Sequence, residues 1–171
     1  MNPDAEKVNI ASGLKLKWSG TLDMGDLYKK MKTWLESSGY GDESKNFKEV
    51  KYVERIGAGG KQIEAKWLGE RNVSDYFSYL ITVTFFITRL RDVEVPFNGK
   101  KIKMSQATVE IKFSADLIKN RKGKWSKGSF MKKIYERLVV KDRMNDYKLE
   151  LYQKIYSFHD EVKTYLNLHK F

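Results

Sequence analysis

Apolar and polar residues alternate along most of this chain, and helical spacing replaces the alternation only near its two ends. The run 14–18 alternates leucine and tryptophan with lysine, which predicts a half-buried strand. Apolar residues between 24 and 35 recur every three or four positions, as on one face of an amphipathic helix. Asp23 is a suitable N-cap for this helix and Gly39 a suitable C-terminal stop. We interpret the aromatic residues of this stripe as core.

The middle of the chain predicts antiparallel strands joined by hairpins. Strands are expected at 47–56 and 63–67, with the glycine-rich run 57–61 as the turn between them. This run lacks the spacing of a phosphate-binding loop and the Ser or Thr after the lysine, and a strand rather than a helix follows it. We therefore interpret it as a hairpin turn.

Two longer segments continue this series. The segment 76–90 has one continuous apolar face and predicts a central strand, and 93–97 predicts a further strand that ends at the hairpin signal Asn98-Gly99. In the next strand, 102–115, the apolar positions change from even to odd between Met104 and Ala107. Such a slip predicts a β-bulge or a bend.

The last third of the chain predicts a loop and helices. The loop is expected at 120–128, and Ser129 can cap the helix that follows, with Phe130, Ile134 and Leu138 facing inward. From 142 to 168 the apolar residues recur every seven positions, which predicts a long helix laid across a sheet.

These elements predict an α+β fold in which a curved antiparallel sheet packs on the long C-terminal helix. Residues 1–12 are expected to be a flexible arm, and residues 13–171 a single domain. The order of one strand, one helix, five strands and a long helix is similar to that of helix-grip domains. That resemblance concerns topology alone, and it implies an apolar ligand cavity between the sheet and the helix.

Several segments from about residue 14 onward resemble a family of small uncharacterised archaeal proteins. The resemblance implies an archaeal cytoplasmic protein and no particular activity. The segments are Leu27-Tyr28-Lys29, Trp34-Leu35, Gly39-Tyr40, Trp67-Leu68-Gly69-Glu70-Arg71-Asn72-Val73-Ser74-Asp75-Tyr76-Phe77, Asp92-Val93-Glu94-Val95 and Gly123-Lys124-Trp125.

Composition agrees with a cytoplasmic location. The 171 residues include no cysteine, which excludes disulfides and thiolate metal sites. The N-terminal residues lack the apolar run of a signal peptide, and the apolar stretch 76–90 is too short to cross a bilayer. We expect a soluble, cytoplasmic protein.

Charge is concentrated in residues 100–133, which hold eleven Lys or Arg and two acids, so that this segment supplies +9 of the net +11. Such a local excess indicates contact with an anionic partner. Trp125 stands among lysines, either exposed for base stacking or folded back into the core. The alternative for the lysines is a merely solubilising surface. The predicted nucleic-acid contacts are Lys100, Lys101, Lys103, Lys119, Arg121, Lys122, Lys124, Trp125, Lys127, Lys132 and Lys133.

We therefore expect a non-catalytic module that binds RNA, or a ribonucleoprotein surface, mainly through the phosphate backbone. The alternative is a protein that binds a small apolar ligand in a cavity between the sheet and the C-terminal helix. An anionic membrane surface is the third possible partner. The predicted cavity residues are Trp18, Trp67, Tyr79, Phe85 and Phe158.

No catalytic cluster is evident in the sequence. His159 and His169 lie ten residues apart and therefore do not share a helical face. Glu70, Arg71 and Asp75 form the best remaining polar set, and a surface ion pair or cap is the simpler interpretation. We expect no enzyme activity, no cofactor and no bound metal.

Overall fold

The computed structural model describes residues 3–41, 47–97, 99–126 and 128–168. Its elements follow in the order β1 (Glu6–Leu22), α1 (Met24–Leu35), β2 (Phe47–Gly57), β3 (Gly60–Asn72), β4 (Phe77–Phe97), β5 (Lys100–Lys119), α2 (Phe130–Tyr135) and α3 (Lys141–Leu168). A π-helical turn, η1 (Glu36–Tyr40), extends α1, and a second, η2 (Glu136–Val140), joins α2 to α3.

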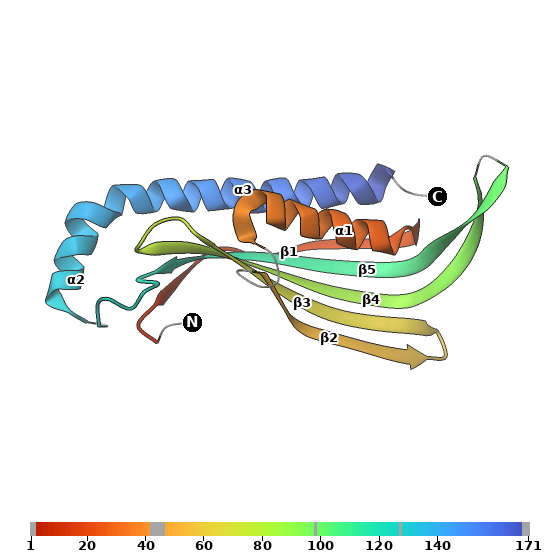
Figure 1. Ribbon diagram of the computed structural model, residues 1–171, viewed down its shortest axis with the longest axis horizontal. Helices are drawn as coiled ribbons and strands as arrows, with labels where there is room; N and C mark the ends of the chain where they lie inside the picture. The colour runs from red at the N-terminus through yellow and green to blue at the C-terminus, as the bar shows by residue number, and fades with distance from the viewer. Residues whose placement is uncertain (1–2, 42–46, 98, 127, 169–171) are drawn as a thin grey trace.

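The strands form one antiparallel sheet in the order β1-β5-β4-β3-β2, which is not closed into a barrel. Both long helices lie on the same face of this sheet, and the other face is open (Figure 1). Helix α3 lies over β1 and β5, and α1 lies beside it. The predicted α+β architecture, a curved antiparallel sheet packed on a long C-terminal helix, is confirmed.

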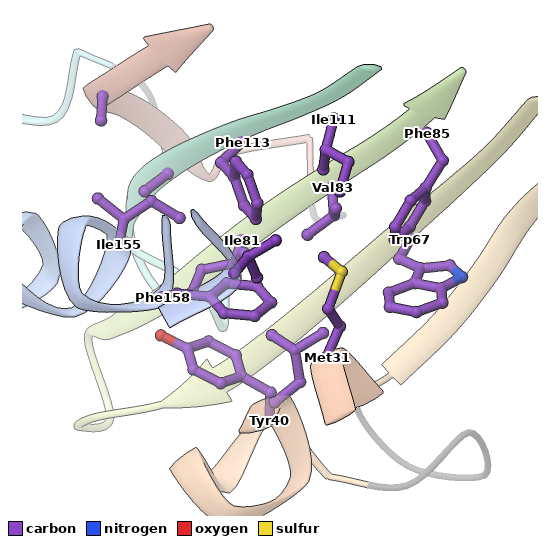
Figure 2. Close-up of a cluster of buried hydrophobic side chains, with 14 of the residues drawn as sticks. Met31, Tyr40, Trp67, Ile81, Val83, Phe85, Ile111, Phe113, Ile155 and Phe158 are labelled. Atoms are coloured by element: carbon purple, nitrogen blue, oxygen red, sulfur yellow. The ribbon is translucent and has the colours of Figure 1, made fainter. Parts of the chain in front are cut away.

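Large aromatic side chains fill the space between the helices and the sheet (Figure 2). Phe158 of α3 is fully buried and stacks on Trp34 of α1, with ring centroids 4.2 Å apart and planes 8° apart. The ring of Phe113 on β5 meets Phe158 edge-on at 5.2 Å. These contacts join both helices to the sheet, and they confirm that the apolar stripes predicted for the two helices face the core.

Local signals placed the first helix and the first hairpin correctly. Asp23 caps α1, since its Oδ1 accepts a hydrogen bond from the backbone N–H of Asp26 at 2.9 Å. Gly39 adopts a φ of 84°, the left-handed conformation that a helix stop requires. The glycine-rich run 57–61 forms the predicted hairpin, with Gly57 paired to Gly60.

Two strand predictions are wrong. The flexible arm expected at 1–12 is instead part of β1 from Glu6 onward, because β5 is long enough to pair with it as far as Lys119. The strands expected at 76–90 and 93–97 are one strand, β4, so four strands rather than five follow α1.

A bulge lets β4 turn without ending. Thr88 pairs with Thr108 and Arg91 with Gln106, so two residues of β4 face the single residue Ala107 of β5. The bulge includes Arg89, whose φ of 56° lies in the left-handed region. The sequence predicted a bulge or bend between Met104 and Ala107 of β5. The extra residue lies instead in β4, opposite Ala107.

Helix α2 is rotated relative to the prediction. Phe130, Ile134 and Leu138 were expected to face inward, and they are 73%, 37% and 77% exposed. The side chain that faces the body instead is Lys132, which is buried in an ion pair with Glu6. A paired lysine therefore occupies the position expected for an apolar residue.

Candidate functional site

The basic segment 100–133 is divided between two ends of the molecule. Lys100, Lys101 and Lys103 lie at the start of β5, and Lys119 lies at its end. At about 3.3 Å per residue, the two groups are roughly 50 Å apart. The β4–β5 hairpin and α2 occupy opposite ends of the fold (Figure 1). The predicted contact residues of 100–133 therefore do not form one compact patch.

Two of the predicted contact lysines are part of an ion-pair network under α2. The Nζ of Lys119 lies 2.9 Å from Glu6 and 3.1 Å from Glu136, and Lys132 also pairs with Glu6. Hydrogen bonds from Lys132 and Lys119 lower the pKa of Glu6 to about 2. The hydroxyl of Tyr76 donates to Glu136 at 2.6 Å. These ion pairs hold α2 and η2 to the sheet.

The loop that contains Trp125 is held by Asn120. The Asn120 side chain donates to the carbonyl of Asp4 at 3.0 Å and to that of Trp125 at 2.6 Å. The ring of Trp125 is half-buried and stacks on Tyr135, with centroids 6.0 Å apart. Of the two alternatives for Trp125, the structure is closer to the folded-back one, because one face of the ring is already covered.

The other predicted contact residues near α2 differ in whether they are paired or exposed. Arg121 donates from its Nε to the carbonyl of Ser74 at 2.7 Å, and Lys122 pairs with Asp75. Lys124 and Lys133 are exposed. Lys127 lies outside the described residues.

The remaining polar candidates are dispersed. Glu70 accepts from the hydroxyl of Ser78 at 2.7 Å, whereas Arg71 lies 3.8 Å from Glu150. His159 lies beside Asp160, and His169 lies outside the described residues. Within the described ranges, no three His, Asp or Glu side chains come close enough to hold a metal ion.

An apolar cavity of about 280 Å³ lies between α1 and strands β2, β3 and β4. The first turns of α1 form one wall, and the inner face of the sheet forms the other. Tyr52, which lines the cavity from the edge strand β2, is 52% exposed. The lining residues are Met24, Gly25, Leu27, Tyr28, Tyr52, Ile63, Ala65, Phe85 and Ile87.

Small residues on facing walls create this space. Gly25 belongs to the first turn of α1, and a Cβ added there would meet only Asp23 Oδ1 within 4 Å, at 3.4 Å. Ala65 lies opposite on β3, between its cross-strand partners Tyr52 and Phe85. A larger side chain at either position would occupy the cavity.

Acidic groups hold the polar ends of the cavity's aromatic wall. Tyr28 donates its hydroxyl hydrogen to Glu49 Oε1 at 3.0 Å, and the Nε1 of Trp67 donates to the same oxygen at 3.0 Å. Tyr52 donates to Glu54 Oε2 at 3.1 Å. Partial burial and this hydrogen bond raise the pKa of Tyr52. Because its hydrogen is donated to Glu54, the Tyr52 oxygen can only accept from a ligand.

The cavity is not where the sequence placed it. Among the predicted lining residues only Phe85 contributes, while Trp67 lies behind it with ring centroids 4.5 Å apart. Tyr79 and Phe158 are fully buried in the core, and Trp18 packs over Gly20. The space between the sheet and α3 is filled by interlocking rings, whereas the space beside α1 is not.

The open face of the sheet carries an arrangement that the sequence could not reveal. One line of cross-strand neighbours runs over the sheet from β2 to β1. It consists of Lys51, Lys66, Thr84, Lys112 and Lys15, each opposite the next on the adjacent strand. We call the four lysines of this line the lysine row. It crosses all five strands over roughly 19 Å, at about 4.8 Å per strand.

Two glutamates partly neutralise the lysine row. Glu64 pairs with Lys51, and Glu110 lies 2.9 Å from Lys15 and 3.3 Å from Lys112. These hydrogen bonds and charges lower the pKa of both carboxyls. Phe86 lies between them in the neighbouring line and is 48% exposed. The open face therefore offers cations beside an exposed aromatic ring.

Comparison with known proteins adds no function, since neither a family model nor a curated protein matches this sequence. Across the part of the chain that the structure describes, every helix is too short or too polar to cross a membrane.

Proposed function

We propose that this protein is a non-catalytic module that binds a small, largely apolar molecule in the cavity beside α1. The observation that carries this proposal is the cavity itself, a partly open space of about 280 Å³ lined almost entirely by apolar and aromatic side chains. Binding pockets for small molecules start at roughly 300 Å³ and combine an apolar wall with a few placed polar groups. The cavity volume lies just below the start of that range, which favours a compact ligand.

The polar groups indicate how such a ligand would be oriented. Tyr52 is half exposed at the cavity, and its oxygen can accept hydrogen bonds because its hydrogen is donated to Glu54. Glu54 is also 2.6 Å from Lys61. A ligand with one hydroxyl or amine group would place that donor at Tyr52 and its apolar part between Ala65 and Phe85. An anionic head is disfavoured by the carboxylates of Glu49 and Glu54.

Filling the cavity tests this function. N-phenyl-1-naphthylamine, a neutral fluorescent probe, should bind to the wild type, and Ala65→Leu should weaken binding by at least about tenfold because the added carbons occupy the site. Ala58→Leu makes the same change at an exposed hairpin position and serves as the matched control. Circular dichroism and Tm establish that both variants fold.

Two results would remove the proposal. One is a wild-type protein that gives no probe signal and carries no small molecule in native mass spectrometry. The other is an Ala65→Leu variant that is folded and binds the probe as tightly as the Ala58→Leu control.

The lysine row supports a second candidate function, the binding of single-stranded RNA on the open face. Like charges directly opposite one another in a sheet are destabilising, and Lys51 faces Lys66 while Lys15 faces Lys112. Phosphates on the lysines would relieve that repulsion, and a base could stack on Phe86. The surface ion pairs with glutamate are weak enough to be displaced, at about 0–1 kcal/mol each.

Salt-titrated fluorescence polarisation with a single-stranded RNA tests this candidate. If the four lysines each release one counterion, the log–log slope of affinity against salt should be about −3. Lys66→Glu with Lys112→Glu should abolish binding, whereas Lys100→Glu with Lys101→Glu, the same charge change at the far hairpin, should leave it intact. Loss of binding in the second pair alone would instead assign the contact to the β4–β5 hairpin.

A further inference from the structure

Helix α2 lies at one end of the molecule (Figure 1). Together with the π turn η2, it presents large apolar side chains to solvent. Phe130, Ile134 and Leu138 are spaced four residues apart, and Met131 lies beside them at 57% exposed. We call these four residues the outward stripe. Neighbouring large apolar side chains that remain in water mark an interaction surface, whereas scattered ones do not.

The outward stripe cannot be hidden by turning the helix. Lys132 on the opposite side of α2 is buried against Glu6, and Glu136 accepts from both Tyr76 and Lys119. Rotating the stripe inward would break these ion pairs and expose charges that are now satisfied. The stripe is therefore held outward by the fold.

Cations border the outward stripe. Lys133, Arg137 and Lys141 are all exposed, and together with Lys119 and Glu136 they line a surface hollow of about 280 Å³ where α2, η2 and α3 meet β5. Between residues 121 and 141 the sequence has eight Lys or Arg and only one acid. The hollow therefore has the charge to accept an anionic headgroup next to an apolar surface.

We propose that α2 and η2 dock this protein on the surface of an anionic phospholipid bilayer. The outward stripe would enter the boundary between headgroups and acyl chains, while Lys133, Arg137 and Lys141 contact lipid phosphates. An apolar face beside a cationic flank is the pattern of helices that lie in the membrane interface. The inference is independent of the cavity, which lies beside the first turns of α1.

Charge distinguishes this partner from the alternatives. A second copy of the chain would bring the same stripe and the same cationic border, so that Arg137 and its neighbours would meet like charges. A nucleic acid would satisfy the cations but would leave Leu138 and Met131 in water. An anionic bilayer would bury the outward stripe and pair with the cations beside it.

Vesicle flotation tests the proposal directly. The protein should float with phosphatidylcholine vesicles that contain about 30% phosphatidylglycerol, bind weakly to pure phosphatidylcholine, and dissociate at high salt. Phe130→Glu with Leu138→Glu should reduce partitioning by at least about tenfold. The matched control, Ile56→Glu with Leu149→Glu, changes two exposed apolar residues elsewhere and should not reduce it.

Reversing the charge of the cations beside the outward stripe tests their contribution to membrane binding separately from that of the stripe. Lys133→Glu, Arg137→Glu and Lys141→Glu together should reduce partitioning by about a hundredfold, at roughly fivefold for each cation. Lys17→Glu, Lys48→Glu and Lys66→Glu make the same charge change on the sheet and should have a much smaller effect.

A fluorescent label reports insertion without disturbing the fold. The chain has no cysteine, so Leu138→Cys introduces a unique labelling site at an exposed position. A polarity-sensitive dye there should shift to the blue on anionic vesicles, whereas the same dye on Ile56→Cys should not. Absence of flotation, an equal loss in the control variants, or a dimer in sedimentation that Phe130→Glu with Leu138→Glu dissolves would overturn the proposal.

Discussion

Replacing Phe158 with alanine probes the core that joins both helices to the sheet. Phe158 is fully buried, stacked on Trp34 and in edge contact with Phe113. Removing a buried phenylalanine ring costs about 3–5 kcal/mol, which includes the transfer term and the cavity left behind. Two aromatic partners lose contacts here, at about 0.5–1.5 kcal/mol each, so we expect the upper half of that range. The loss is a large share of the roughly 5–15 kcal/mol that stabilise a typical domain.

Phe130→Ala is the matched control, since it removes the same ring from a helix at a position that is 73% exposed. Its effect on the free energy of unfolding should stay within about 0.5 kcal/mol. Urea unfolding followed by circular dichroism measures both variants, with unchanged m-values as the sign of an intact two-state transition. A loss below about 1 kcal/mol for Phe158→Ala, or equal losses for the two variants, would refute the packing described for α3.

Two further predictions concern the end of the molecule under α2. Asn120→Ala should lower the free energy of unfolding by about 3 kcal/mol. It removes the side chain's hydrogen bonds to Asp4 and Trp125, and it places alanine at a φ of 52°. In urea unfolding, Asn120→Gly should recover part of this loss. The folded-state pKa of Glu6 is about 2, below its ordinary value of 4.5, so its ion pairs stabilise the fold above the higher value and lose that contribution as pH falls through the lower one. Because the carboxylate is partly exposed, the free energy of unfolding of the wild type should exceed that of Glu6→Gln by only about 1 kcal/mol near pH 7. The difference should shrink as pH falls below the ordinary value and vanish below about pH 2. A difference that does not change with pH would contradict the network.

The sequence by itself determined the elements whose signals are local. Apolar spacing placed the two long helices with the correct faces toward the core, because three to four residues per turn fix which side chains align. The run 57–61 fixed the first hairpin through its glycines. The ends of strands were less certain. The alternation of Val8 and Ile10 with Lys7 and Asn9 is too short to define a strand by itself, and β1 extends back to Glu6 because β5 offers it a partner there.

Tertiary structure alone decided which residues meet. The charges of 100–133 are close in sequence but lie at opposite ends because β5 is fully extended, whereas Lys51 and Lys112 are distant in sequence and share one line across the sheet. The apolar spacing of α2 predicted that Phe130, Ile134 and Leu138 face inward, whereas the pairing of Lys132 with Glu6 turns the helix so that this stripe lies in water. The cavity likewise depends on Gly25 and Ala65 lying on facing walls. Periodicity specifies which face of an element is apolar, but surfaces and cavities are made by side chains from several elements, and only the folded chain brings those together.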